Sequence, residues 1–166
     1  MNNYKQKPFI PAIQKTSTLV VLSILALIGF LISINSTKTE VSSSYTIKVN
    51  AANYMKKSME LLKVNRMISG VFIDDENDPN ETGLVGSPFS LITTDEGDLD
   101  AKLTTLDPNF AAGMVELMTQ LNLQKNDTVA VLMTGSMPGA NIAVLTALKS
   151  LSVIPITITS VGASQW

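Results

Sequence analysis

One stretch decides the fold: Thr128-Val-Ala-Val-Leu-Met-Thr-Gly-Ser-Met-Pro-Gly-Ala-Asn-Ile-Ala-Val-Leu-Thr-Ala-Leu-Lys-Ser-Leu-Ser-Val-Ile-Pro-Ile-Thr-Ile-Thr-Ser160. Residues 128–134 are apolar and partly β-branched, over a length typical of a buried strand. Residues 135–139 hold two glycines and a proline, which interrupt regular structure. Residues 140–150 place apolar side chains three apart, as on one face of a helix (Ile142, Leu145 and Leu148). Residues 153–159 are again β-branched. The pattern therefore predicts a βαβ unit with parallel strands.

The chain before this unit contributes further helices. Asp107-Pro108 is typical of a helix start, and an apolar face follows it (Phe110, Met114, Leu117, Met118 and Leu121). An earlier helix is predicted from a cap at Asn50 to Ile68, with an apolar stripe of its own (Tyr54, Met55, Met59, Leu62 and Met67). Residues 71–73 are interpreted as a short strand or a buried lead-in, residues 83–94 as a loop and residues 101–106 as a connection. The fold class is α/β: a partial Rossmann-like parallel sheet with flanking helices, preceded by one N-terminal transmembrane helix.

The N-terminal region predicts a membrane anchor at residues 19–35, because no charge interrupts its apolar run. Three lysines precede this run, which favours a cytoplasmic N-terminus at residues 1–18 and an extracytoplasmic body. We expect a single-pass protein of the cell membrane, with a polar stalk at residues 36–46 and an α/β domain at residues 47–166. A cleaved signal peptide and a buried core helix are the alternatives for the apolar run.

Composition excludes several kinds of chemistry. The chain has neither cysteine nor histidine, so it lacks thiol nucleophiles and the commonest general base. A net charge of −2 gives no reason to expect nucleic acid as a partner. Residues 74–81 are rich in carboxylates, but the EF-hand pattern fails, since its glycine position is Pro79 and its final glutamate position is Val85. A solvated loop is therefore favoured over a cation site, and neither a metal nor a cofactor is predicted. Residues 95–100 are interpreted as a second acidic turn.

The glycine loop is the candidate ligand site. Ligands of parallel sheets bind beyond the carboxyl ends of the strands, where a helix N-terminus also offers unpaired amides to an anion. The loop matches neither a phosphate-binding loop nor a nucleophile elbow, so a plain strand-to-helix turn is an equal alternative. The loop after the second strand is expected to lie beside it. The predicted anion site comprises Thr134, Gly135, Ser136, Gly139, Asn141, Ser160, Gly162 and Ser164.

Two strands alone do not make a stable parallel sheet. The second strand also runs into the proposed site only a few residues before Trp166, and no helix follows it. We therefore expect this chain to be the N-terminal part of a longer protein.

Three blocks of the chain resemble the poly-gamma-glutamate system protein family: residues 87–111, residues 134–149 and residues 160–166. The resemblance runs from about Thr46 to the end, and the predicted anchor fits it too. It implies a bacterial, membrane-anchored protein that takes part in making or exporting poly-gamma-glutamate, with other subunits of that system, the membrane and the glutamate polymer as partners. It implies no known reaction and carries over no catalytic residue.

Three functions remain open. The first is an accessory protein that binds glutamate-derived carboxylates or partner subunits at the glycine loop. The second is a hydrolase or transferase acting on the polymer, with Ser136 or Ser164 as nucleophile and with a base from Asp95, Asp98, Lys149 or the expected remainder of the protein. The third is a structural membrane adaptor whose loops bind no ligand.

Overall fold

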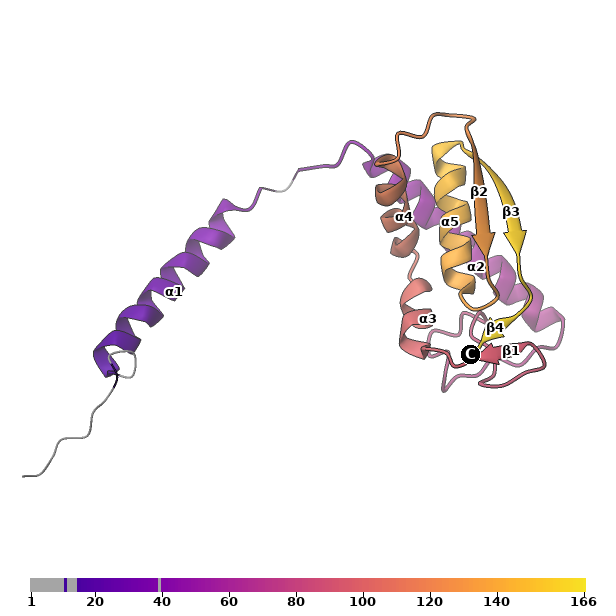
Figure 1. Cartoon of the computed structure of the whole chain (residues 1–166), viewed down its shortest axis with the longest axis horizontal. Coiled ribbons are helices and arrows are strands. Elements are labelled where there is room, and N and C mark those ends of the chain that lie inside the picture. Colours follow the sequence, from indigo (N-terminus) through magenta and orange to yellow (C-terminus); the bar gives the residue numbers. More distant parts are fainter. Residues whose placement is uncertain (1–10, 12–14, 39) are drawn as a thin grey trace, which may run out of the picture. The chain divides into compact units, whose positions relative to one another are not determined.

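The computed structural model describes residue 11, residues 15–38 and residues 40–166 (Figure 1). The chain divides into two compact units, Met1–Val41 and Ser42–Trp166. The first unit contains helix α1, and the second contains all the other helices and strands. We describe each unit by itself.

Helix α1, Thr16–Ser36, has 21 residues and no charged side chain. At 1.5 Å per residue it is about 32 Å long, which matches the hydrocarbon core of a bilayer. It is long and apolar enough to cross a membrane, and it contains the whole of the predicted anchor. The predicted cytoplasmic segment, residues 1–18, lies mostly outside the described residues.

Helix α2, Tyr45–Ile68, begins five residues before the predicted cap at Asn50. The predicted stalk is therefore shorter, and the second unit's first helix starts inside it. Its buried residues are Ala51, Met55 and Met59, spaced four apart. Tyr54, Leu62 and Met67 are exposed, so that part of the predicted stripe is wrong. The predicted end at Ile68 is confirmed, and Gly70 follows with a φ of +71°.

Helices α4, Asn109–Thr119, and α5, Pro138–Leu151, pack against α2 and against each other. The contact uses small side chains, because Ala111, Ala143 and Ala147 are fully buried and let the helix backbones approach closely. Val115 and Met55 fill the remaining space. Helix α4 begins one residue later than predicted, but the Asp107 carboxylate still accepts a hydrogen bond from the Asn109 amide at 2.8 Å. Its centre of burial is Ala111 and Val115, whereas the predicted Leu117 and Leu121 are exposed.

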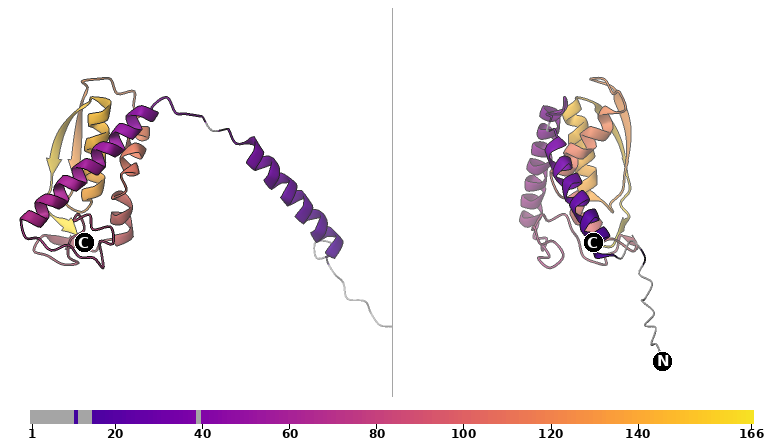
Figure 2. Two further views of the ribbon diagram at one scale, coloured as in Figure 1. Left: turned by 180° about the vertical axis from the view of Figure 1, so that it is seen from behind. Right: turned by 90° about the vertical axis from the view of Figure 1, so that its left-hand side faces the viewer.

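Strands β2, Thr128–Met133, and β3, Ile154–Thr159, form a parallel pair in continuous register, from Thr128 opposite Ile154 to Met133 opposite Thr159. The predicted strand, loop, helix and strand are thus confirmed in this order. Figure 2 shows three layers: α2 on one side, α4 and α5 in the middle, and β2 with β3 on the other side.

A second parallel pair was not predicted. Strand β1, Thr93–Asp95, lies in the region interpreted as a loop and an acidic turn, and it pairs with β4, Ala163–Ser164. Helix α3, Leu99–Thr105, occupies the predicted connection. Residues 71–73 form no strand, and Val71 and Phe72 are exposed, so both alternatives for this segment are wrong. The described residues therefore contain two two-stranded parallel sheets, and not one Rossmann-like sheet.

Candidate functional site

The structure brings the two predicted loops together. The Ser164 amide donates a hydrogen bond to the Ser136 hydroxyl at 2.9 Å. The Thr134 hydroxyl donates to the carbonyl of Gly162 at 3.4 Å. Residues from beyond the ends of β2 and β3 therefore meet at one edge, as expected for neighbouring parallel strands.

The glycine loop is also fixed by its own side chains. The Thr134 hydroxyl accepts from the Ser136 amide at 3.3 Å and lies 3.1 Å from the Ser136 hydroxyl. The Asn141 side-chain amide donates to the Thr134 carbonyl at 2.7 Å. Asn141 thus connects the first turn of α5 to the end of β2, and its side-chain nitrogen already donates one hydrogen bond within the chain.

The two glycines permit close contact between chain segments. A Cβ on Gly135 would lie 2.9 Å from the carbonyl oxygen of Val161, and one on Gly139 would lie 2.6 Å from the carbonyl oxygen of Thr105. The two glycines were expected to let a ligand approach the backbone closely. At both positions it is another part of the chain that approaches closely.

The opening turn of α5 retains unpaired donors. The Asn141 amide donates to the carbonyl of Met137 at 3.0 Å. In the part of the chain that the structure describes, the amides of Gly139 and Ala140 have no hydrogen-bond acceptor. Gly139 is buried and Ala140 is partly exposed, so these amides meet the usual requirements for anion recognition at a helix start.

The remaining predicted residues have mainly structural roles. The Ser160 amide donates to the Met133 carbonyl at 3.0 Å and extends the pairing of β3 with β2. A Cβ on Gly162 would lie 3.2 Å from the Thr94 side chain, next to β1.

Lys102, on α3, is a residue that the sequence interpretation missed. Its side chain is 2% exposed, and its ammonium donates to the main-chain oxygens of Trp166 at 2.6 Å and Ser164 at 3.4 Å. Burial lowers the pKa of Lys102 below its ordinary value. A positive charge is therefore held beside the segment that contains Ser164. Its partners lie 62 and 64 positions later in the chain, so no local pattern in the sequence indicates its burial.

The candidate catalytic groups do not assemble around the two serines. The Lys149 ammonium lies 4.6 Å from the centre of the Tyr54 ring, at the other end of α5. The Asp98 carboxylate accepts from the Ala101 amide at 3.0 Å and caps α3, and the Asp95 carboxylate accepts from the Glu96 amide. Among the described residues, no carboxylate or amine is hydrogen-bonded to either serine hydroxyl.

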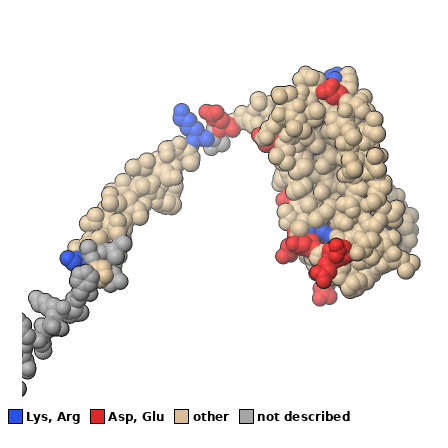
Figure 3. Space-filling model, viewed as in Figure 1, with Lys and Arg blue, Asp and Glu red and all other residues tan. Residues whose placement is uncertain are grey.

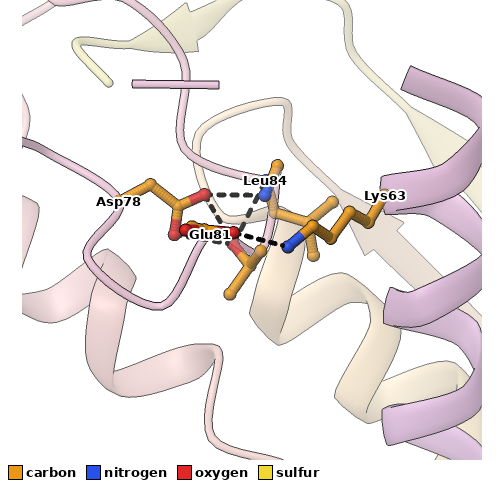
Figure 4. A network of polar contacts seen from close by, with 6 residues as sticks. Lys63, Asp78, Glu81 and Leu84 are labelled. Carbon is orange, nitrogen blue, oxygen red and sulfur yellow. Dashed lines mark hydrogen bonds and ion pairs between the residues drawn. The ribbon is translucent and has the colours of Figure 1, made fainter. Parts of the chain in front are cut away.

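The acidic segment 74–81 uses its carboxylates to hold its own loop. The Asp74 carboxylate accepts from the Asn77 side chain at 2.7 Å, and this bond is the main cause that lowers the pKa of Asp74. Asp78 is fully buried and accepts from the Thr82 hydroxyl and from the Gly83 amide at 2.6 Å (Figure 4). These bonds give Asp74 and Asp78 a structural role in the loop.

Comparison with known proteins yields no match. No family model fits the chain, and neither a curated protein nor a solved structure is found to be similar to it.

Proposed function

We propose that this protein is a membrane-anchored accessory component of poly-gamma-glutamate synthesis or export, and that it binds carboxylate groups where the two loops meet. In this proposal α1 is the anchor, with its N-terminus in the cytoplasm and the body outside the membrane. We choose poly-gamma-glutamate as the polymer because residues 87–111, 134–149 and 160–166 resemble the poly-gamma-glutamate system family. The other subunits of that system are the expected protein partners.

The main observation in support of a binding site is the hydrogen bond from the Ser164 amide to the Ser136 hydroxyl, because this bond joins the two loops at the N-terminus of α5. The amides of Gly139 and Ala140 supply donors there, and the helix dipole favours a negative charge. The buried ammonium of Lys102 adds a nearby positive charge. Since no base among residues 40–166 is hydrogen-bonded to the serine hydroxyls, we favour binding over catalysis.

The test is calorimetric titration of the full chain in detergent with γ-linked glutamate oligomers. We expect binding, and we expect Ala140→Asp to weaken it by about tenfold, because a fixed carboxylate in the first turn repels the ligand; tenfold is about 1.4 kcal/mol. Aspartate is acceptable in the first turn of a helix, so the variant should fold.

Asn53→Asp is the matched control, since it adds the same charge on α2. No heat change with the parent protein, together with unchanged polymer output in cells lacking the gene, would refute the proposed function. If Asn53→Asp weakens binding and Ala140→Asp does not, the polymer binds at α2 and the assigned site is wrong.

A further inference from the structure

Charge is divided unevenly between α2 and the rest of the second unit. Helix α2 carries five basic side chains and one acidic side chain, Glu60 (the basic ones are Lys48, Lys56, Lys57, Lys63 and Arg66). Residues 69–166 carry three basic and twelve acidic side chains. In the view of Figure 3, which is taken from the side away from α2, acidic side chains gather at the end that holds α3. Helix α2 is therefore the basic element of the second unit, and most of the unit's acidic side chains lie on other elements.

Two of the α2 lysines are available to a partner. Lys48 forms an ion pair with Glu116, and Lys63 pairs with Glu81 at 3.1 Å. Lys56 and Lys57 are exposed, and no carboxylate pairs with them in the described part of the chain. These two adjacent lysines can neutralise negative charge on another molecule.

An apolar stripe lies next to these lysines. Leu61, Val64 and Ile68 follow Lys57 at intervals of four, three and four residues, which places them on one face of the helix. Their side chains are 66%, 52% and 79% exposed. The opposite face of α2 is the buried one, so this stripe points away from the body. Lys57 shares this face, and Lys56, about 100° round the helix, flanks it. Lysines beside an exposed apolar stripe are suited to a helix that lies in an anionic membrane interface.

The position of α2 in the chain supports the same partner. Eight residues separate the end of α1 from the start of α2. Eight residues span at most about 29 Å when fully extended, whatever the arrangement of the two units. Since α1 is long enough to cross a membrane, the first turn of α2 lies within about this distance of the surface of any bilayer that α1 crosses.

We propose that the outward face of α2 binds a lipid surface containing anionic headgroups, with Lys56 and Lys57 on the headgroups and Leu61, Val64 and Ile68 among the upper acyl chains. A soluble polyanion would neutralise the charge of the lysines but would leave the three apolar side chains in water. Charge complementarity and the apolar stripe together therefore favour the lipid surface.

The absence of cysteine in the sequence allows a single label to be placed. The full chain is prepared as Val64→Cys, labelled with an environment-sensitive fluorophore and reconstituted in vesicles of phosphatidylcholine, alone or with phosphatidylglycerol. Lys125→Cys, at an exposed position before β2, is the matched control. We expect a blue shift, and quenching by spin-labelled lipid, for the Val64 label in the anionic vesicles only. The shift should be lost at roughly 1 M salt, where the screening length is about 3 Å.

Charge reversal supplies the second measurement. Lys56→Glu combined with Lys57→Glu should abolish the shift of the Val64 label, while Lys149→Glu should not. All three lysines are exposed, so these changes remove no buried packing. A Val64 label that behaves like the control in both kinds of vesicle would overturn the proposal. So would a shift produced equally by γ-linked glutamate oligomers in detergent without lipid, which would identify the polymer as the partner of α2.

Discussion

The two outer layers of the second unit differ in how they are packed. Helix α2 buries one face completely against α4 and α5, and its other face is exposed. Strand β3 is exposed at every residue, and β2 alternates between exposed and half-buried residues. Parallel sheets are normally covered on both faces, so the sheet is the less protected layer.

The outward face of the sheet is also chemically different from that of α2. It consists of uncharged residues that share a side because they are paired in register (Thr128, Ala130, Leu132, Ile154, Ile156 and Ile158). Leu132 is 80% exposed. From this difference we conclude that the helices make the core by themselves and that the sheet contributes little to it.

The largest expected effect is the loss of a buried side chain between the helices. Met55→Ala should lower the free energy of unfolding by about 2–5 kcal/mol, because Met55 is fully buried and its removal leaves a cavity. Leu132→Ala should change it by no more than about 0.5 kcal/mol, because its side chain is already in water. Urea denaturation of the full chain in detergent measures both. Equal losses would mean that the sheet is covered in solution and that the comparison is mistaken.

The next effect concerns the start of α5, where the helical layer meets α3. Gly139→Ala should cost about 1–3 kcal/mol, because the new methyl group would lie 2.6 Å from the Thr105 carbonyl oxygen. Gly113→Ala, within α4, meets nothing within 4 Å and should stabilise the protein by about 0.4–1 kcal/mol. The same denaturation experiment compares the two. A neutral Gly139→Ala would show that α5 does not contact α3 this closely.

The sequence predicted best what depends on neighbouring residues. The order of β2, the glycine loop, α5 and β3 follows from local periodicity, and the parallel pairing follows from the helical crossover between the two strands. It predicted only part of each buried helix face. On α2, Met55 and Met59 belong to the predicted stripe and are buried, but the buried Ala51 was not in that stripe, and Leu62 and Met67 are exposed. A small residue in close helix packing resembles any surface alanine in the sequence.

The candidate site also has a part that could be predicted from the sequence and a part that could not. The meeting of Ser136 with Ser164 was predictable, because both follow adjacent strands. The roles of Lys102 and Thr105 were not, because they depend on contacts with Trp166 and Gly139 from distant parts of the chain. Strand β1 was missed for the same reason, as it has three residues and its partner lies about seventy positions later.

Lys102 predicts a dependence of stability on pH. Because its pKa is lower in the folded protein than the ordinary value of 10.5, the unfolded chain binds more protons in the interval between the two values. The contribution of Lys102 to the free energy of unfolding should therefore rise with pH across that interval and stay constant below it. Lys102→Met should flatten this rise, as measured by urea denaturation at several alkaline pH values. A rise that persists unchanged in the variant would assign it to another group.

The smallest expected effect is at the open edge of the sheet. The amides of Ile154 and Ser160 donate to carbonyls of Asp127 and Met133, so residues at even positions of β3 direct their amides toward β2. Pro155 therefore stands where an N–H would point away from β2, and it removes a donor from the exposed edge.

Pro155→Val should lower the free energy of unfolding by only about 0.4–1 kcal/mol, through the greater freedom of the unfolded chain. It should also raise concentration-dependent association, measured by sedimentation in detergent, because an exposed edge with a full set of donors can pair with another strand. Thr157→Val keeps the donor at the next edge position and is the control. If neither variant associates more than the parent protein, the edge of β3 is protected by something other than its proline.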